Sequence, residues 1–555
     1  MAQQHVVTAA AAGTDRSTSD EAQSAAADVP TSEPIEPTTS TAPPAAIATG
    51  KGRDRWLSAG IALVMLAVYL RSLMPGIGYS GDAAKWQMLS VVGGVPHATG
   101  YPLYVALIQA FHHVVPFGSA AWRTNLFSAV CAVGVVVLIF RLLRILDVRW
   151  EVATAAALTF GVTKVFWTQS AIAEVYTLHL LFVMGILVCL TRWRTGAGNR
   201  WLLGGVALLA LSFGNHVGTI LVVPAVLWLV CSDWRRAITL RNALWAGLFA
   251  LVGASQYLYL LFATSRGGYV EVQVHNLADI RDIVTGGPFK NDMFVFSVKE
   301  VIKDRIPMLW EFLREEFSVL LVPMAYGLVR GLRTANRARR DVAIGLALVG
   351  LTSAFYGLNY DVLDVIVFFL PLFLVLALFL GIGLDGIVGW IGERWAGNRP
   401  LLVGAVGALA AIPLASGLID YTKASQRGTV EASERFERAM DVVGSNAILI
   451  TDTYDDSEFF WYYVLGEGLG TSRNLRVVHE ATPGDVKDYF AGRSSQVTDA
   501  AELIGIDHHP LIYTASPYQP APMRRAGFKV TEVAKDVWRI DPPAAPDPDD
   551  PTDSG

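Results

Sequence analysis

The residues of this chain that are best suited to chemistry follow its first long apolar stretch. Tyr79-Ser-Gly-Asp82 precedes Lys85, and His97-Ala-Thr-Gly-Tyr101-Pro102 comes shortly afterwards. A carboxylate can accept a proton, and lysine and histidine can bind an anion or donate hydrogen bonds. Polar residues near a membrane are costly to place, which makes them functional candidates. The segment is therefore the first place to look for a site.

Further polar and aromatic residues flank other apolar stretches in the same manner. They are Lys164, Trp167, Gln169, Glu174, Tyr176, Asn215, His216, Arg266, Lys290, Asn359, Tyr360, Asp361 and Asp364. None of them belongs to a nucleotide-binding or metal-binding signature. The three cysteines lie in or beside apolar blocks and read as small buried hydrophobic residues. We expect no metal, no required cofactor and no nucleic-acid partner.

Single residues of this set also have purely structural interpretations. Asp82 follows a glycine and could only cap a helix that begins there. Glu174 could be a solvated charge at the end of a loop, and His216 a hydrogen-bonded packing residue. Tyr101 and Trp167 could anchor the membrane interface, and Lys164 could extend to the headgroups. The set is more informative than its members, provided that the chain brings them together.

The elements that must position these residues are membrane-spanning helices. The chain has 555 residues, of which 53% are hydrophobic and 17% charged, with a mean hydropathy of +0.40. Its apolar residues form long blocks close to the length of about 20 residues that crosses a bilayer. The blocks predict about eleven spans, near residues 56–73, 124–143, 151–167, 175–191, 201–215, 217–232, 243–264, 317–333, 341–357, 363–384 and 400–418.

Arginine and lysine in the short loops orient these spans, because such residues concentrate on the cytosolic side. The basic loops around Arg144, Arg194, Arg236, Arg339 and Arg394 all fall on one side if the first span leaves the cytosol. Residues 101–115 must then lie along the outer surface, within an outer loop at 74–123. A second outer loop covers 265–316. The candidate residues above then gather on the outer face.

The two ends of the chain differ from its middle. Residues 1–54 are rich in Ala, Ser, Thr and Pro and predict a disordered cytosolic tail. The transmembrane region covers 55–419. From 420 to 541, short β-type runs at 447–451 and 510–514 alternate with helical stretches, and 527–540 is typical of a hairpin. We expect a small extracytoplasmic α/β domain there, followed by a disordered tail at 542–555.

The ordered motifs of the first half resemble a known family. Met74-Pro-Gly, Ser80-Gly-Asp82, His97-Ala-Thr-Gly-Tyr-Pro, Arg123-Thr-Asn-Leu-Phe-Ser-Ala, Phe166-Trp-Thr-Gln, Glu174-Val-Tyr176 and Gly214-Asn-His216 follow one another. This order is similar to that of the multi-pass protein O-mannosyltransferases, within the C-type (GT-C) glycosyltransferases that use polyprenyl-phosphate sugars. The resemblance covers about residues 56–230. Two departures stand out: Tyr79 occupies an acidic position of the family, and Ala-Thr replaces Pro-Pro after His97.

The resemblance implies an enzyme that moves a sugar, mannose or another hexose, from a polyprenyl phosphate to an extracytoplasmic hydroxyl of a protein or glycan. It places the catalytic base at Asp82. The residues expected to bind substrates are Lys85, His97, Tyr101, Lys164, Gln169, Glu174, Tyr176, Asn215, His216, Arg266, Lys290 and Asp361. Of these, Lys85, His97, Lys164, His216, Arg266 and Lys290 are candidates for the phosphate. Direct displacement would invert the anomeric centre. We expect an integral plasma-membrane protein. A transporter or lipid flippase is the main alternative, and a non-catalytic scaffold a third.

Overall fold

The computed structural model describes residues 50–78, 81–266, 268–395, 399–451, 453–493, 497, 511–516 and 518–542. Most of both predicted tails, and Tyr79 and Ser80 of the first motif, lie outside the described residues. The first helix, α1 (Gly50–Ser72), starts inside the predicted N-terminal tail. All contacts below lie within the compact unit Gly52–Gly555.

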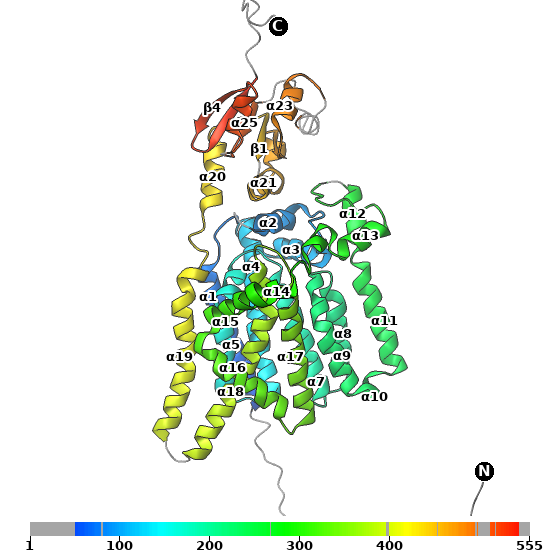
Figure 1. Cartoon of the computed structure of the whole chain (residues 1–555), viewed down its shortest axis with the longest axis vertical. Coiled ribbons are helices and arrows are strands. Elements are labelled where there is room, and N and C mark those ends of the chain that lie inside the picture. Colours follow the sequence, from blue (N-terminus) through cyan, green and yellow to red (C-terminus); the bar gives the residue numbers. More distant parts are fainter. Residues whose placement is uncertain are drawn as a thin grey trace, which may run out of the picture. The chain divides into compact units, whose positions relative to one another are not determined.

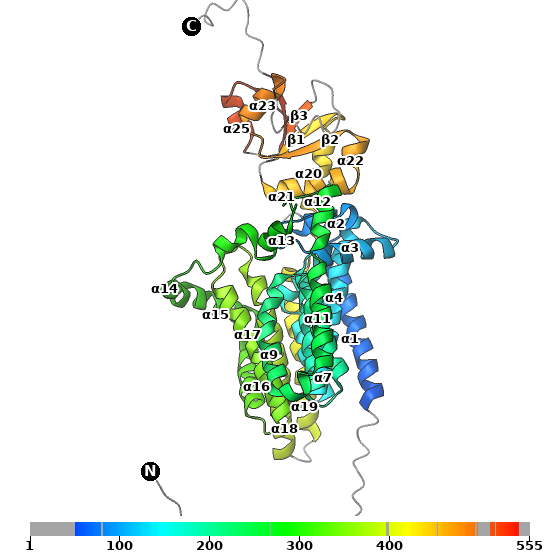
Figure 2. The ribbon, with the colours of Figure 1, turned by 90° about the vertical axis from the view of Figure 1, so that its right-hand side faces the viewer.

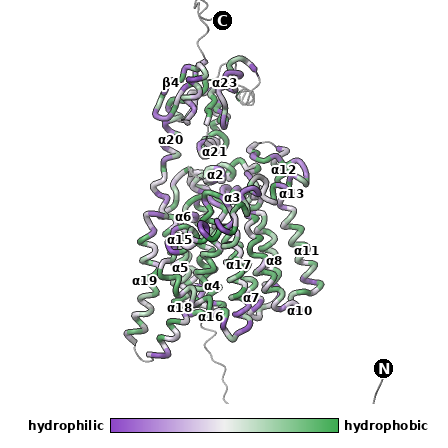
Figure 3. Tube along the Cα trace, in the orientation of Figure 1, coloured by the Kyte–Doolittle hydropathy of each residue, from purple (hydrophilic) through white to green (hydrophobic). Residues whose placement is uncertain are grey.

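Long apolar helices pack side by side as a bundle (Figure 1). Apolar residues dominate these helices, while polar residues are more frequent in the C-terminal domain (Figure 3). Among the described residues, seven helical stretches are long and apolar enough to cross a membrane. They are Gly52–Ser72, Ala120–Ile145 (α4), Tyr176–Arg194 (α7), Leu240–Arg266, Arg337–Leu358 (α17), Val365–Arg394 and Val403–Ala424. The chain is a polytopic helical membrane protein.

Three of these stretches need further description. Leu240–Arg266 combines α11 (Leu240–Ser255) with α12 (Leu258–Arg266), and Val365–Arg394 combines η5 (Val365–Phe369) with α18 (Leu370–Arg394). Val403–Ala424 lies in α19 (Arg399–Ala424). The other predicted spans fall on shorter helices. These are α5 (Trp150–Gly161) and α6 (Lys164–Ala171), α8 (Asn199–Ser212), η1 (Val217–Val222) and α9 (Val223–Ser232), and η4 (Ser318–Leu320) and α16 (Leu321–Arg333). The count of eleven crossings stays a prediction.

Buried aliphatic and aromatic side chains of α4, α5, α7 and α18 fill the centre of the bundle. Phe140, Phe160 and Phe373 are completely buried there. Helices α16 and α18 approach so closely that a Cβ on Gly327 would collide with the backbone of Phe379. Small residues at such contacts are the usual way in which membrane helices pack. The bundle is therefore a tightly packed frame for whatever lies at its ends.

Helices α2 (Ala83–Val92) and α3 (Pro102–Val114) lie at one end of the bundle, beside the C-terminal domain, in both views (Figures 1 and 2). The loop that contains α13 (Leu277–Val284), η2 (Gly287–Asp292), α14 (Val298–Glu300), η3 (Val301–Arg305) and α15 (Ile306–Phe317) connects α12 with η4.

The two predicted outer loops are joined by backbone hydrogen bonds. The amide of Val95 donates to Tyr269 at 2.9 Å, and the amide of Glu271 donates to Val95 at 2.8 Å. Gly94 has a φ of +127°, and a Cβ there would collide with the carbonyl oxygen of Tyr269. Only glycine tolerates both the backbone conformation and the close approach. This contact fixes where Glu271 stands relative to α2.

The C-terminal region forms a five-stranded sheet with the order β2-β1-β3-β5-β4. Its strands are β1 (Ala447–Thr451), β2 (Leu475–His479), β3 (Leu511–Thr514), β4 (Lys529–Ala534) and β5 (Val537–Asp541). Strand β1 pairs in parallel with β2 and β3, whereas β5 is antiparallel to β3 and β4. The predicted strands at 447–451 and 510–514 and the closing hairpin are confirmed.

Helices accompany this sheet. They are α20 (Glu431–Met440), α21 (Tyr454–Trp461), η6 (Tyr462–Gly466), α22 (Leu469–Ser472), α23 (Pro483–Phe490) and α25 (Pro520–Arg525). One face of the sheet packs on Phe459 and Phe460, and the same hydrophobic cluster continues to Trp86 and Tyr104 of α2 and α3. The hydroxyl of Tyr462 accepts a hydrogen bond from the amide of Ala121 at 3.2 Å. The domain is thus packed directly onto α2, α3 and the start of α4.

Candidate active site

Asp82, Lys85 and His97 form a contact cluster at the start of α2. Lys85 Nζ lies 3.1 Å from Asp82 Oδ1 and 2.9 Å from His97 Nδ1. His97 Nε2 lies 3.6 Å from Asp82 Oδ2. Asp82 occupies the N-cap position of α2 but makes no capping hydrogen bond with its side chain. The interpretation of Asp82 as a simple helix cap is therefore wrong.

Lys85 is almost completely buried, and its side chain is 1% exposed. Its Nζ lies 3.1 Å from Glu271 Oε2 of the second outer loop and 3.1 Å from Glu458 Oε1 of α21. Lys85 therefore joins three carboxylates from three segments that are far apart in sequence. A buried ammonium requires such partners, because an unpaired charge away from water is very costly.

Sequence reasoning missed Glu271 and Glu458. Glu271 is an ordinary loop residue until the bridge to Val95 brings it to Lys85. Glu458 precedes the aromatic run Phe459-Phe460-Trp461, and its side chain is 1% exposed. A charge beside a block of large apolar residues was the one local signal that it would be buried.

The contacts determine the proton positions of the cluster. Burial would raise the pKa of Asp82, but His97 and Lys85 outweigh it and hold the pKa below its usual value. Burial lowers the pKa of His97, and Lys85 adds to this, against the opposite effect of Asp82 and Glu271. Lysine has only donors, so Nδ1 of a neutral His97 must accept and Nε2 must carry the proton. Asp82 is thus ionised, and a donor faces it.

Glu174 is the second acidic candidate, and its environment is different. It is 7% exposed, and its amide donates to Ser128 Oγ at 3.2 Å, which fixes the turn between α6 and α7. Burial, followed by the nearby charges of Asp82 and Asp364, raises its pKa well above the usual value. Glu174 is buried, so the interpretation as a solvated loop-end charge is wrong. Two carboxyl groups with separated pKa values are typical of catalytic sites.

A cavity of about 280 Å³ opens beside Asp82. It brings together seven of the candidate residues, namely Asp82, His97, Tyr101, Tyr176, His216, Tyr360 and Asp364, with Tyr356, Phe289 and Phe368. His216 Nδ1 accepts a hydrogen bond from the amide of Gly218 at 2.9 Å. Asp82 is the most exposed member of the cluster, with 35% of its side chain accessible. The cavity therefore combines two reachable carboxyl groups, those of Asp82 and Asp364, with aromatic walls.

The remaining predicted residues do not line this cavity. Asn215 is buried next to it and donates to the carbonyl of Val175 at 3.4 Å. The others make separate contacts. Lys164 forms an ion pair with Glu315 at 3.6 Å, and Lys290 forms one with Asp282 at 2.6 Å. Arg266 lies over the ring of Phe262, the amide of Asp361 donates to the carbonyl of Asp292, and Gln169 lies on α6. Trp167 is a buried packing residue whose indole donates to Ser72 at 2.8 Å.

Arg305 is a further residue that the sequence did not indicate. Its guanidinium donates to the carbonyls of Gly357 and Tyr360, at 3.0 and 2.6 Å. It thereby holds the segment that carries Tyr360 into the cavity wall. No group of three or more His, Cys, Asp or Glu suited to a metal ion occurs among the residues that the structure describes.

Comparison with known proteins places part of this site in a family. Residues 82–239 match the family model described as the protein O-mannosyl-transferase TMEM260 N-terminal domain. The mouse protein O-mannosyl-transferase TMEM260 is 31% identical over 215 residues, which cover 36% of this chain and 29% of the relative. The Dictyostelium discoideum protein O-mannosyl-transferase tmem260 is 24% identical over 323 residues, 53% of this chain and 35% of the relative. The matches span about a third of these relatives' length.

The fold is also similar to that of a solved structure. ArnT from Cupriavidus metallidurans, bound to undecaprenyl phosphate, superposes with a TM-score of 0.57 at 12% identity, over 89% of this chain and 98% of that one. At this identity the likeness concerns the fold, which is of the GT-C type. The family model covers Asp82, Lys85, His97, Glu174 and His216. The resemblance seen in the sequence is confirmed for residues 82–239, which match the model of the protein O-mannosyl-transferase TMEM260 N-terminal domain.

Proposed function

We propose that the chain is a membrane glycosyltransferase that moves a hexose, mannose first among the candidates, from a polyprenyl-phosphate carrier to a hydroxyl acceptor, with Asp82 as the general base. One observation carries this proposal: an ionised and accessible carboxylate stands at an aromatic-walled cavity, inside the region that matches the family model. Protein O-glycosylation is the expected role because the matched relatives are named protein O-mannosyl-transferases.

The proposed reaction requires little from the protein. The acceptor hydroxyl attacks the anomeric carbon, its proton passes to Asp82, and the polyprenyl phosphate leaves with the electron pair of the broken bond. Such a leaving group needs no general acid, but it needs donors for its charge. His216, which lines the cavity, is the candidate for this role, because its Nδ1 accepts from Gly218 and its Nε2 can donate, whereas the proton of His97 faces Asp82. Lys85 already faces three carboxylates, so its proposed role is to keep Asp82 ionised.

Support for a lipid-linked donor comes from the fold. The ArnT structure of similar fold carries undecaprenyl phosphate. Polar and aromatic groups meet next to apolar helices in this chain, which suits a substrate with a sugar phosphate at one end and a polyprenyl tail at the other. Direct displacement in one step inverts the anomeric configuration. No metal or other cofactor is required by this scheme.

We further propose that the site faces the outside of the plasma membrane, with the N-terminus in the cytosol and the C-terminal domain extracytoplasmic. The domain would help to select or orient the protein or glycan acceptor, because it packs on α2 and contributes Glu458 to the Lys85 cluster. Its sheet and helices therefore stand beside the place where an acceptor must enter.

The direct test uses the purified full chain in lipid nanodiscs with radiolabelled polyprenyl-phosphate mannose and extracytoplasmic proteins of the same cell. We expect label on Ser or Thr, released by base and attached with the opposite anomeric configuration to the donor. Glucose and galactose donors test the sugar. Absence of transfer from every donor, together with movement of the lipid across vesicles, would overturn the proposal in favour of a flippase.

A further inference from the structure

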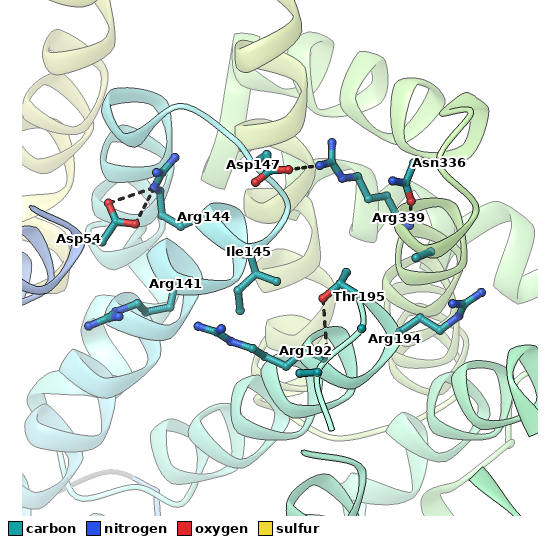
Figure 4. Close-up of a pocket in the computed structure, with 13 residues that line it drawn as sticks. Asp54, Arg141, Arg144, Ile145, Asp147, Arg192, Arg194, Thr195, Asn336 and Arg339 are labelled. Carbon is teal, nitrogen blue, oxygen red and sulfur yellow. Dashed lines mark hydrogen bonds and ion pairs between the residues drawn. The ribbon is translucent and has the colours of Figure 1, made fainter. Parts of the chain in front are cut away.

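An arginine-lined cavity lies at the end of the bundle opposite to the Asp82 cluster. Helix α4 runs from Ala121, which contacts the C-terminal domain, to Arg141 and Arg144, which line this cavity of about 680 Å³. The start of α1, the end of α7 and the start of α17 complete its wall (Figure 4). We call it the arginine pocket. Its charged and polar lining residues are Asp54, Arg141, Arg144, Asp147, Arg192, Arg194, Thr195, Asn336 and Arg339.

Three of the five arginines are held by carboxylates. Arg144 Nε lies 3.2 and 3.1 Å from the two carboxylate oxygens of Asp54. Arg339 pairs with Asp147, and Arg194 pairs with Asp341 on α17 (the first of these pairs is drawn in Figure 4). Ion pairs of this kind connect α1 with α4, and α17 with both α7 and the loop after α4. They hold the wall of the pocket in one arrangement.

Arg141 and Arg192 differ from these three. Arg141 Nε donates to the hydroxyl of Ser58 at 2.7 Å, and the guanidinium of Arg192 lies 5.4 Å from the ring centre of Trp201. Neither makes an ion pair with a carboxylate among the described residues. Each is fixed by a neutral partner that leaves its charge uncompensated. The pocket therefore carries an excess of positive charge on oriented side chains.

A cavity with oriented guanidinium groups suits one class of ligand. Guanidinium presents parallel N–H donors that match the oxygens of a phosphate, and Arg–phosphate contacts are among the strongest in proteins. The retention of basic residues on one side of a membrane explains arginines at helix ends. It does not explain why five of them line a single cavity, or why two remain without a counter-charge.

The position of the pocket gives a second indication of its ligand. Four of the seven stretches long enough to cross a membrane end at its wall: Gly52–Ser72, Ala120–Ile145, Tyr176–Arg194 and Arg337–Leu358. The ends of membrane spans lie at the depth of the lipid headgroups. Basic pockets between such ends are suited to anionic headgroups. The volume is larger than one phosphate needs.

We propose that the arginine pocket binds a phosphate-bearing anion, with Arg141 and Arg192 as its principal ligands. The phosphate belongs either to an anionic phospholipid headgroup or to a soluble phosphate compound. The two sources share the same contacts, so the test separates them. This inference does not rest on the proposed transferase activity.

The test measures thermal stabilisation of the full chain in neutral detergent. One arm adds phosphatidylglycerol, with phosphatidylcholine as the neutral lipid, and the other adds pyrophosphate at constant ionic strength. We expect saturable stabilisation in at least one arm. The double variant Arg141→Gln/Arg192→Gln should weaken the apparent affinity by about tenfold or more, because two charge-assisted contacts are lost.

The matched control is Arg235→Gln/Arg241→Gln. Both arginines are exposed and lie outside the pocket lining, Arg235 in α10 (Trp234–Ala237) and Arg241 at the start of α11. The neighbouring Arg236 reaches the carbonyl of Trp193, which places them at the same end of the bundle. The control should keep the parental affinity. If Arg141→Gln/Arg192→Gln loses affinity for phosphatidylglycerol alone, the ligand is a lipid headgroup. If it loses affinity for pyrophosphate, the ligand is a soluble phosphate compound. Equal affinities in both double variants, or no stabilisation at all, would overturn the proposal.

A second measurement keeps the test decisive if the double variant does not fold. Phenylglyoxal modifies accessible arginines of the unmutated chain, and peptide mass spectrometry reports each site. Phosphatidylglycerol or pyrophosphate should protect Arg141 and Arg192 by at least about threefold more than Arg235 and Arg241, as expected for occupied guanidinium groups. Uniform protection of all four sites would refute a specific pocket.

Discussion

The two ends of the helix bundle handle buried and exposed charge in opposite ways. At the Asp82 end, one lysine that is 1% exposed faces three carboxylates and a histidine. At the other end, five arginines and two aspartates line an open pocket. Carboxyl groups of the chain itself surround the first cation, whereas the second group has more positive charge than its own aspartates can balance.

This difference separates a site prepared for chemistry from one prepared for binding. Lys85 keeps Asp82 ionised without help from a ligand, so the proposed base is ready before any substrate arrives. Arg141 and Arg192 are oriented by Ser58 and Trp201, and their charge is left for a ligand to balance. Changes at the first end should therefore affect rate and stability strongly, and changes at the second should affect mainly binding.

The largest effect is expected for Asp82→Asn. Asparagine keeps the shape and the N-cap position but cannot take a proton, so sugar transfer should fall by about 10²–10⁴ with donor binding nearly unchanged. Turnover and donor affinity of the purified variant measure this, and Asp282→Asn in the second outer loop is the control. Retention of more than about a tenth of parental turnover would remove Asp82 as the base and turn attention to Glu174.

Lys85→Met should be the most destabilising single change in the cluster. It leaves Asp82, Glu271 and Glu458 facing one another without a cation, at a cost of about 3–5 kcal/mol. Heat denaturation and protease sensitivity of residues 425–542 report the loss. Lys290→Met, which removes an exposed pair with Asp282, should cost less than about 1 kcal/mol. Similar losses in the free energy of unfolding for the two variants would show that the buried pairs of Lys85 contribute no more to stability than the exposed pair of Lys290.

Glu458→Gln should change the pH dependence of stability. Burial raises the pKa of Glu458 to about 8, against the opposing effect of Lys85. A group with a raised pKa binds more protons when folded, so its contribution is complete at acid pH and disappears as the pH rises through about 8. The melting temperature of the parent should therefore fall relative to that of the Gln variant between pH 6 and pH 9.

The parallel pH profiles of parent and variant would contradict this expectation. Asp82, Glu271 and Lys85 belong to the same cluster and are present in both proteins, so the difference between the two profiles reports on Glu458. Glu174 is the other buried carboxyl near Asp82, and it is also unchanged in both.

The smallest effect on stability is expected for Asp147→Asn in the arginine pocket. Asp147 and Arg339 are 69% and 38% exposed, and such surface pairs contribute about 0–1 kcal/mol. Asp147 has a φ of +62°, which asparagine adopts readily. The variant should melt within about 2 °C of the parent and bind pyrophosphate or phosphatidylglycerol more tightly, because one negative charge is gone. Weaker anion binding would contradict the inferred polarity of the pocket.

Much of the fold was accessible from the sequence because its signals are local. Apolar length predicted helices in every span, and strand β1 was placed at the residues that form it, since a buried run of β-branched and aliphatic residues has one obvious role. Strand β2 was missed, although Leu475–His479 alternates weakly. The two helices α5 and α6 were predicted as one span because hydropathy does not register the break around Thr163.

The site was only partly accessible, for a physical reason. Asp82, His97 and His216 could be nominated because polar residues beside apolar helices are costly and therefore informative. Glu271 and Glu458 have no such signal, since their role arises from a loop-to-loop bridge and from domain packing. Lys164, Gln169 and Arg266 were nominated by the same reasoning as Asp82, yet none of them lines the cavity beside it.

The contact between Lys85 and Glu458 has a consequence for how the protein is made. Roughly 370 residues separate the two partners, and ribosomes add about 5–20 residues per second. For some tens of seconds, Lys85 of a newly inserted chain therefore lies beside Asp82 while Glu458 has not yet been synthesised. Chains that terminate early keep their membrane helices but never complete the cluster. In such chains the apolar residues of α2 lack the part of their cluster that the C-terminal domain supplies.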